Sequence, residues 1–277
     1  MLRIPMRAIP THIERGRLMD EECIRKFDSQ GQDYKQAFQI FLDHTDQKRN
    51  ARRWLQRVVE RLPNRGVFID AGAGNGEMAK TFAGSFKQTV AIEPNTYLLG
   101  QLRQALPTAE AIDRPIMGAQ PSAPGDFVLC SHTLYYIPSE EWLAHVERLV
   151  SWMAPTGVTI IVLQYRDSGC MNMVYHFCGH RFELRQTIEA FRAKHGDGYE
   201  IMTTLDPAHV VTSDLAKTYA VAEFMLNLLE IANPPSRRDV EKYLLANFAM
   251  PDGRFKIPVH QDFVEIRHGG GKFEEQL

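Results

Sequence analysis

The segment 67–77 constrains the fold of this chain more than any other part of the sequence. A short apolar run ends at Asp70, and three glycines follow at alternate positions, Gly72, Gly74 and Gly76. Glycine permits positive φ, and without Cβ atoms the backbone can approach a ligand closely. The residues after Glu77 have a helical pattern. The sequence therefore predicts a strand, a tight turn and the start of a helix.

A second acidic residue lies where a nucleotide-binding βαβ unit would carry one. The next apolar run, 89–92, ends at Glu93, about twenty residues after the turn. A carboxylate at such a strand end can accept hydrogen bonds from both vicinal hydroxyls of a ribose. The alternative role for Glu93 is to cap the helix that begins near Asn95. Because the turn, the helix start and the second carboxylate agree, we expect a nucleoside-bearing cofactor.

The spacing of the glycines distinguishes two such cofactors. Dinucleotide sites favour G-x-G-x-x-G, with the pyrophosphate at the helix N-terminus. Here Glu77 stands in the place of the third glycine, and its carboxylate would repel a pyrophosphate. S-adenosylmethionine (SAM) carries a sulfonium, an ammonium and a carboxylate but no phosphate, so acidic residues near the turn are tolerated. We therefore expect SAM as the cofactor, and an NAD-dependent oxidoreductase is disfavoured.

Strand and helix patterns alternate through the central part of the chain. Apolar runs of strand length occur at 67–69, 89–92, 109–112, 127–130 and 158–163, and helical patterns lie at 95–105 and 139–153. This alternation predicts an α/β fold with a Rossmann-like, twisted, mostly parallel sheet and helices on both faces. After residue 163 the order changes to helical patterns at 182–194, 214–229 and 237–248 and strand patterns at 199–205 and 255–267.

These patterns predict one SAM-binding domain over 21–268. Its expected parts are an N-terminal helical cap (21–63), a nucleotide-binding core (66–164), a C-terminal helical insertion that acts as a lid (165–254) and a last strand (255–267). Proline lacks a backbone N–H, so we expect the last strand to break at Pro258. A flexible arm is expected at 1–20 and a flexible tail at 269–277.

Composition limits the classes of partner. The net charge of −2 gives no basic footprint for nucleic acid. The longest apolar run has the length of a strand and not of a membrane span, and the first residues lack the apolar core of a signal peptide. The four cysteines show no framework spacing, which favours a reduced, cytoplasmic setting. No metal site is expected, because the group Cys170, His176, Cys178 and His180 lacks metal-ligand spacing.

Several segments resemble a known family. The pattern from Asp70 through the three glycines resembles motif I of class I SAM-dependent methyltransferases, and Ile92-Glu93-Pro94 resembles their second motif. The segment 34–45 looks like the N-terminal helical region of histamine N-methyltransferases, and 126–137, with its Leu-Tyr-Tyr triplet, resembles their fourth-strand segment. The resemblance spans most of the chain and implies the methyltransferase fold and a small-molecule substrate.

The chain departs from this family at the positions that touch substrate. Gln47 occupies the place of the glutamate that holds the substrate amine, and His132 that of a glutamine before the Leu-Tyr-Tyr triplet. The family has an asparagine near its last strand, and the corresponding position in this chain lies within 259–261, which contains no asparagine. The resemblance thus implies a shared cofactor site, and histamine itself is not expected to be the substrate.

The expected cofactor contacts gather at the ends of successive strands, the edge at which open α/β sheets bind ligands. The backbone of the glycine turn would face the methionine part of SAM, Glu93 the ribose and Asp113 the adenine amino group. Asp70 would attract the ammonium or orient the turn, and Asp113 has ordinary loop chemistry as its alternative. The full predicted set is Asp70, Gly72, Ala73, Gly74, Gly76, Glu93, Pro94, Asp113 and Ser131.

His132 is the candidate base or orienting group, since the pKa of a free imidazole lies near neutrality. A hydrogen-bonded structural histidine is the alternative. Aromatic faces attract a sulfonium or substituted ammonium, so tyrosines are expected at the site, although Phe38 and Tyr136 also fit core packing. The predicted catalytic residues are His132, Tyr175 and Tyr34, and the predicted substrate-binding residues are Gln47, Tyr34, His132, Tyr136 and Tyr175.

Three functions are compatible with these features. The first is methyl transfer from SAM to a nitrogen or oxygen of an amine-bearing small molecule, of the kind used in secondary metabolism. In the second, SAM is itself the substrate. Its amino group attacks the carbon next to sulfur, releasing methylthioadenosine and closing a small ring, as in azetidine-2-carboxylate synthases. The third is SAM binding without turnover. The sequence does not predict the oligomeric state.

Overall fold

The computed structural model describes residues 22–27, 31–228, 231 and 233–270. The predicted flexible arm, 1–20, lies outside the described residues, as does the part of the predicted tail that follows Gly270.

A seven-stranded sheet in the order β3-β2-β1-β4-β5-β9-β6 forms the core. Neighbours among β1 to β5 pair in parallel, and β9 lies antiparallel between β5 and β6. This confirms the predicted Rossmann-like, mostly parallel sheet. The strands are β1 (Val67–Ala71), β2 (Gln88–Ile92), β3 (Glu110–Ile112), β4 (Gly125–Ser131), β5 (Met153–Gln164), β6 (Tyr199–Asp206) and β9 (Gln261–His268). The strand order reverses between β1 and β4, where such sheets bind ligands beyond the carboxyl ends.

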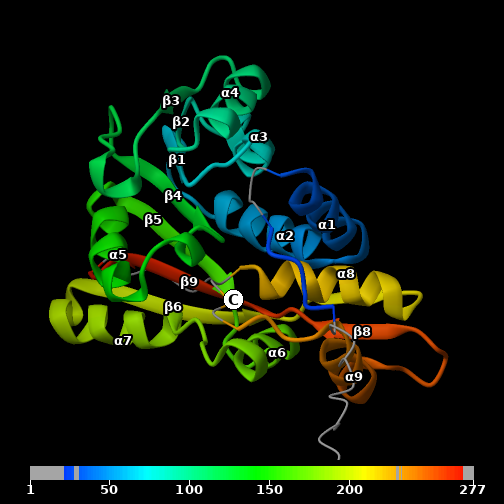
Figure 1. Ribbon diagram of the computed structural model, residues 1–277. Helices are drawn as coiled ribbons and strands as arrows, with labels where there is room; N and C mark the ends of the chain where they lie inside the picture. Colours follow the sequence, from blue (N-terminus) through cyan, green and yellow to red (C-terminus); the bar gives the residue numbers. More distant parts are fainter. Residues whose placement is uncertain (1–21, 28–30, 229–230, 232, 271–277) are drawn as a thin grey trace, which may run out of the picture.

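Helices cover both faces of the sheet (Figure 1). One face carries Phe68, Phe127 and Phe263, and α2 (Gln47–Glu60) and α3 (Glu77–Ala83) pack on it. The ring of Trp54 in α2 lies 4.4 Å from that of Phe263. On the same side, Leu102 of α4 (Thr96–Ala105) packs on β2. The opposite face is covered by α5 (Trp142–Ser151) and α7 (Leu184–His195).

The N-terminal cap consists of α1 (Gln32–His44) and α2. Residues 22–26, which were expected to be helical, are not: Cys23 forms an isolated bridge with Ser236, and Arg25 pairs at 2.7 Å with the buried carboxylate of Glu223. These long-range contacts tie the segment to α8 (Leu215–Leu226) and to Ser236, the residue before α9. A helical pattern in the sequence could not reveal them.

Of the predicted helical insertion, 165–254, α6 (Gly169–Cys178), α8 and α9 (Arg237–Phe248) lie outside the core sheet, whereas α7 and β6 belong to the core. A second sheet pairs β7 (His209–Thr212) with β8 (Phe255–Pro258). The strand expected over 255–267 breaks at Pro258, but its two halves lie in different sheets, β8 beside β7 and β9 in the core. Helix α8 packs against α1, α6 and α9, so the cap and the insertion adjoin (Figure 1). No helix within the described ranges combines the length and the apolar character needed to cross a membrane.

Candidate active site

In the glycine turn after β1, three glycines at alternate positions have backbone angles in the left-handed region. The φ angles of Gly72, Gly74 and Gly76 are 78°, 57° and 85°. A Cβ atom at Gly72 would lie 2.2 Å from the Thr133 hydroxyl, so this glycine fixes the close packing of the turn on the segment after β4. A Cβ at Gly74 would meet no atom of the described residues within 4 Å. The backbone at Gly74 is therefore open to a ligand, as a SAM-binding turn requires.

Glu93 connects this turn to the next helix. Its carboxylate, 7% exposed, accepts the Gly74 N–H at 2.9 Å and the Asn95 N–H at 2.8 Å. Asn95 is itself the N-cap of α4, since its side chain accepts the N–H groups of residues 97 and 98. Glu93 is thus not the helix cap. Because a carboxylate can accept about four hydrogen bonds, it keeps capacity for ribose hydroxyls.

Asp70 at the end of β1 carries an unsatisfied buried atom. The residue is 2% exposed, and its Oδ2 has no hydrogen-bond partner among the residues that the structure describes. Burial raises the pKa of Asp70 to about 7, with the charge of Lys48 acting in the opposite direction and that of Glu93 in the same direction. A buried unpaired oxygen costs free energy that a cationic ligand group would recover. This oxygen therefore fits the ammonium of SAM, and the turn and Glu93 fit the rest of the cofactor.

Three positions that the family resemblance links to substrate meet in one hydrogen-bonded network. The His132 Nε2–H donates to Gln261 Oε1 at 2.8 Å, and the Gln261 amide donates to the backbone carbonyl of Gln47 at 3.3 Å. The Gln47 side-chain amide donates to Gln164 Oε1 at 2.8 Å and to the Val259 carbonyl at 3.0 Å. The elements that meet are α2, the carboxyl end of β5 and the start of β9. The side-chain N–H groups of Gln47 are thus used inside the protein.

His132 has both ring nitrogens engaged. The Tyr135 hydroxyl accepts the Gln164 N–H at 2.8 Å and lies 3.0 Å from His132 Nδ1, to which it donates. Burial, followed by the positive charge of Lys48, lowers the pKa of His132 to about 3. The ring is therefore neutral and fixed in orientation. This arrangement disfavours the role of base and matches the alternative of a hydrogen-bonded structural histidine, while the orienting role stays a prediction.

Aromatic side chains from the cap and from the segment after β4 meet beside this network. The hydroxyls of Tyr34 in α1 and Tyr136 in the 3₁₀ helix η2 (Leu134–Tyr136) are 3.4 Å apart. Tyr34 also packs against Phe38 and Phe224, with ring centroids 6.2 Å and 5.5 Å away. Phe38 packs as expected, whereas the packing role expected for Tyr136 is wrong, since this residue is 66% exposed.

Tyr175 lies in α6 with 49% of its surface exposed. The guanidinium of Arg181 stacks 4.2 Å above its ring, and Arg181 pairs with Asp167 at 2.8 Å. One face of the ring is therefore already covered by a cation. The ring of Tyr175 thus contacts Arg181, whereas Tyr34 and Tyr136 contact each other.

The remaining predicted residues lie at the carboxyl edge of the sheet. Asp113 follows β3 and is exposed, Pro94 is exposed beside Glu93, and Ser131 ends β4. Their roles stay predictions. Glu77 differs from expectation, because its carboxylate forms an ion pair with Arg52 of α2. This pairing weakens the argument that Glu77 would repel a pyrophosphate.

Lys48 is the residue that the sequence analysis missed. It follows Gln47 at the start of α2 and lies one turn before Arg52, whose pairing with Glu77 directs this face of α2 toward the glycine turn. Burial lowers the pKa of Lys48, and the negative charges of Glu77 and Asp70 partly offset this effect. The sequence QKRNARRWLQR around it is so rich in basic residues that Lys48 resembles one more exposed charge.

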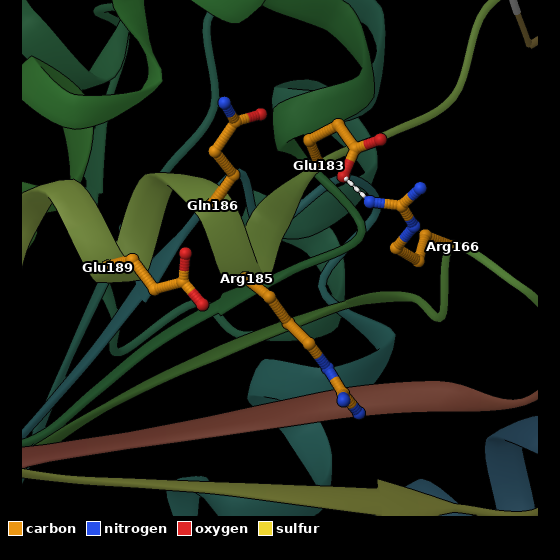
Figure 2. Close-up of a pocket in the computed structure, with 5 residues that line it drawn as sticks. All are labelled: Arg166, Glu183, Arg185, Gln186 and Glu189. Atoms are coloured by element: carbon orange, nitrogen blue, oxygen red, sulfur yellow. Dashed lines mark hydrogen bonds and ion pairs between the residues drawn. The ribbon is translucent and has the colours of Figure 1, made fainter.

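An open depression elsewhere offers no comparable arrangement. Figure 2 shows its lining, in which Arg166 pairs with Glu183 at 2.5 Å while Arg185 points toward β9. Arg185 there binds the buried Asp262 at 2.6 Å. Both guanidinium groups thus already have partners. In the described ranges no group of three or more His, Cys, Asp or Glu residues is placed to hold a metal ion.

Comparisons with known proteins agree with this geometry. Residues 42–209, more than half of the chain, match the protein family described as "Methyltransferase domain". Similar solved structures include a functionally unknown protein from Deinococcus radiodurans R1 (TM-score 0.51, 18% identity, 77% of this chain and 84% of that chain). Another is the N-methyltransferase NodS from Bradyrhizobium japonicum WM9 in complex with S-adenosyl-L-homocysteine (0.51, 12%, 86% and 99%).

At these identities the solved structures support the fold alone. A search of curated proteins found no significant match. The family match covers the glycine turn, Glu93 and the segment after β4, so it decides between SAM and NAD in favour of SAM as the cofactor. The chain belongs to the methyltransferase domain family and has the fold of the class I SAM-dependent methyltransferases.

Proposed function

We propose that this protein transfers a methyl group from SAM to a nitrogen, or an oxygen, of a small molecule. The observation that supports this proposal is the direct contact between the cofactor turn and the predicted acceptor side. Thr133 packs on Gly72 and donates to the carbonyl of Ala71 at 3.3 Å, and the next residue toward β4 is His132. An acceptor held near His132, Tyr34 and Tyr136 would therefore lie beside the cofactor.

The residues on the acceptor side would position the acceptor and shield it from water. They would not remove a proton from it. When bound, SAM supplies a methyl group on a positively charged sulfur, and its transfer requires alignment and the exclusion of water. His132, with a pKa of about 3, stays neutral and cannot take up a proton at neutral pH. The acceptor must then enter with a free lone pair, which suits a weakly basic nitrogen better than an alkylammonium ion.

The proposal separates this enzyme from the histamine N-methyltransferases that it resembles. No carboxylate replaces the amine-holding glutamate, because position 47 is a glutamine whose amide binds Gln164 and Val259. An acceptor amine would therefore meet no anion at this position. Small molecules are proposed as acceptors because the family that the sequence resembles acts on them, and the net charge of −2 gives no overall basic balance that would favour nucleic acid.

Product analysis tests the reaction. The purified protein is incubated with SAM alone and then with SAM and a panel of aromatic amines, imidazoles and alkylamines, followed by chromatography of the adenosine products. We expect S-adenosylhomocysteine only when an acceptor is present. Methylthioadenosine from SAM alone would contradict methyl transfer and support ring closure. Tight SAM binding without either product would support a binding protein.

A further inference from the structure

We propose that Lys48 binds the carboxylate of SAM, beside Asp70, whose unpaired oxygen fits the ammonium of the same amino-acid end. This inference rests on the proposed function only through the cofactor, and it assigns a specificity-determining role to a residue of the N-terminal cap. The amino-acid end of SAM is a zwitterion, whose two charges are attached to one carbon atom. A complementary site needs one anion and one cation, close together and each free to accept a partner.

Asp70 supplies the anion. It is 2% exposed, lies at the end of β1 directly before the glycine turn, and its Oδ2 has no hydrogen-bond partner. Buried polar atoms in folded proteins are almost always paired, so an unpaired oxygen beside an open turn indicates a missing ligand group. Its sheet neighbour Ala91 packs toward α4 on the same face, which is also the face that α2 and α3 cover.

Lys48 supplies the cation. The start of α2 is fixed by Gln47, whose side chain binds Gln164 and whose carbonyl binds Gln261. One turn later Arg52 pairs with Glu77, the first residue of α3. These two anchors orient the intervening face of α2 toward the glycine turn. Within the part of the chain that the structure describes, the Lys48 ammonium forms no hydrogen bond or ion pair.

The two opposite charges interact without forming a direct ion pair. Lys48 and Asp70 each lie in the electrostatic field of the other, yet no salt bridge joins them. Arg52, the other nearby cation, is occupied by Glu77, and Glu93 is occupied by two backbone N–H groups. A zwitterion placed between Lys48 and Asp70 would satisfy both groups. SAM and S-adenosylhomocysteine carry such a group beside the nucleoside.

Isothermal titration with three probes tests the assignment. The probes are S-adenosylhomocysteine, 5′-deoxy-5′-(3-aminopropylthio)adenosine, which lacks the carboxylate, and 5′-deoxy-5′-methylthioadenosine, which lacks the whole amino-acid end. For Lys48→Met we expect affinity for S-adenosylhomocysteine to fall by roughly 10- to 100-fold, the effect of losing one charge-assisted hydrogen bond, while the other two affinities stay unchanged. Lys48→Arg should restore most of the loss.

Asp70→Asn has a different expected pattern. It should weaken binding of the first two probes, which both carry the ammonium, and leave methylthioadenosine unchanged. Arg49→Met is the matched control, since Arg49 is the exposed neighbour of Lys48 on the same helix and the substitution removes the same charge. Its affinity for all three probes should equal that of the parent protein.

Two results would overturn the inference. Equal losses for all three probes in Lys48→Met would show a structural role, and an unchanged affinity for S-adenosylhomocysteine would place Lys48 away from the carboxylate. Failure of the proposed function is distinguishable from both. The parent protein would then bind none of the three probes, or would bind S-adenosylhomocysteine without producing it from SAM and any acceptor.

Discussion

The cofactor side and the acceptor side of this site differ in how their polar groups are satisfied. At the glycine turn the structure leaves groups available: the backbone at Gly74 is open, and Asp70 Oδ2 has no partner. At the acceptor side His132 and Gln47 bind groups of the protein itself. The first side thus leaves charged and open groups for a ligand. Under the proposed function, the second side would be a preformed wall that selects the acceptor by shape more than by charge.

The largest effect is expected from a substitution that breaks the contact between the cofactor side and the acceptor side. Gly72→Ala places a Cβ against Thr133 and forces a non-glycine residue to adopt a φ of 78°. The overpacking and the strained backbone should together lower the free energy of unfolding by about 3 kcal/mol. SAM binding should be lost with it. Gly84→Ala is the control, because no atom lies within 4 Å of a Cβ at that position. Denaturant unfolding and titration with SAM measure both effects, and a Gly72→Ala protein of parental stability would refute the close packing.

The next prediction separates stability from cofactor affinity. Gln261→Leu removes the acceptor of His132 Nε2–H and the donor to the Gln47 carbonyl, and leaving these buried groups unpaired should cost about 2–3 kcal/mol. SAM affinity should change less than about twofold, since no cofactor group is involved. Gln101→Leu, at an exposed glutamine of α4, is the control for urea unfolding. A large loss of SAM affinity in Gln261→Leu would show that the acceptor side also contributes to cofactor binding.

A third prediction concerns pH and the charge of Asp70. Burial raises the pKa of Asp70 to about 7, well above that of a free aspartate, so the ligand-free protein holds this proton more tightly than the unfolded chain. The stability of the ligand-free protein should therefore decrease between about pH 4 and pH 7. Binding of an ammonium requires the ionised form, so SAM affinity should fall by roughly tenfold from pH 8 to pH 6. In Asp70→Asn, SAM binding should be weaker and its affinity should not change with pH. If the affinity of this variant fell with pH as in the parent protein, a group other than Asp70 would be responsible for the pH dependence.

The smallest effect is expected at the acceptor side. Tyr136→Phe removes a hydroxyl whose contact with Tyr34 is long, at 3.4 Å, and largely exposed. Stability should change by less than about 0.5 kcal/mol, and SAM affinity should stay the same. The kcat/KM for the acceptor should fall a few-fold if this hydroxyl orients it. Tyr97→Phe, at an exposed tyrosine of α4, is the control, and equal kcat/KM values in both variants would remove Tyr136 from the acceptor side.

The parts of the fold that the sequence predicts correctly depend on local patterns. The runs at 67–69 and 158–163 lie within β1 and β5, and Pro258 ends β8, because apolar alternation and a missing N–H act on neighbouring residues. The glycine turn is predictable for the same reason. Residues 22–26 were predicted wrongly, since their conformation depends on Glu223 and Ser236, far away in the chain.

The candidate site shows the same division. Its positions along the strand ends follow from the α/β pattern, but the partners of its side chains do not. Nothing in the sequence pairs Arg52 with Glu77 or brings Gln261 to His132. Lys48 was missed because its importance depends on which face of α2 meets the glycine turn. Such information arises from packing between elements and not from spacing within one.

His132 adopts a φ of 56°, alone among the described residues other than glycine. Only a few side chains tolerate this backbone region, chiefly asparagine, aspartate, histidine and glycine, because most residues place their Cβ against the following carbonyl. At this position, beside the proposed acceptor, the backbone conformation therefore limits which residue types can occur. An enzyme of this architecture that evolves toward a new acceptor has few substitutions open at residue 132, so changes in specificity should arise more readily in the α1 and η2 tyrosines.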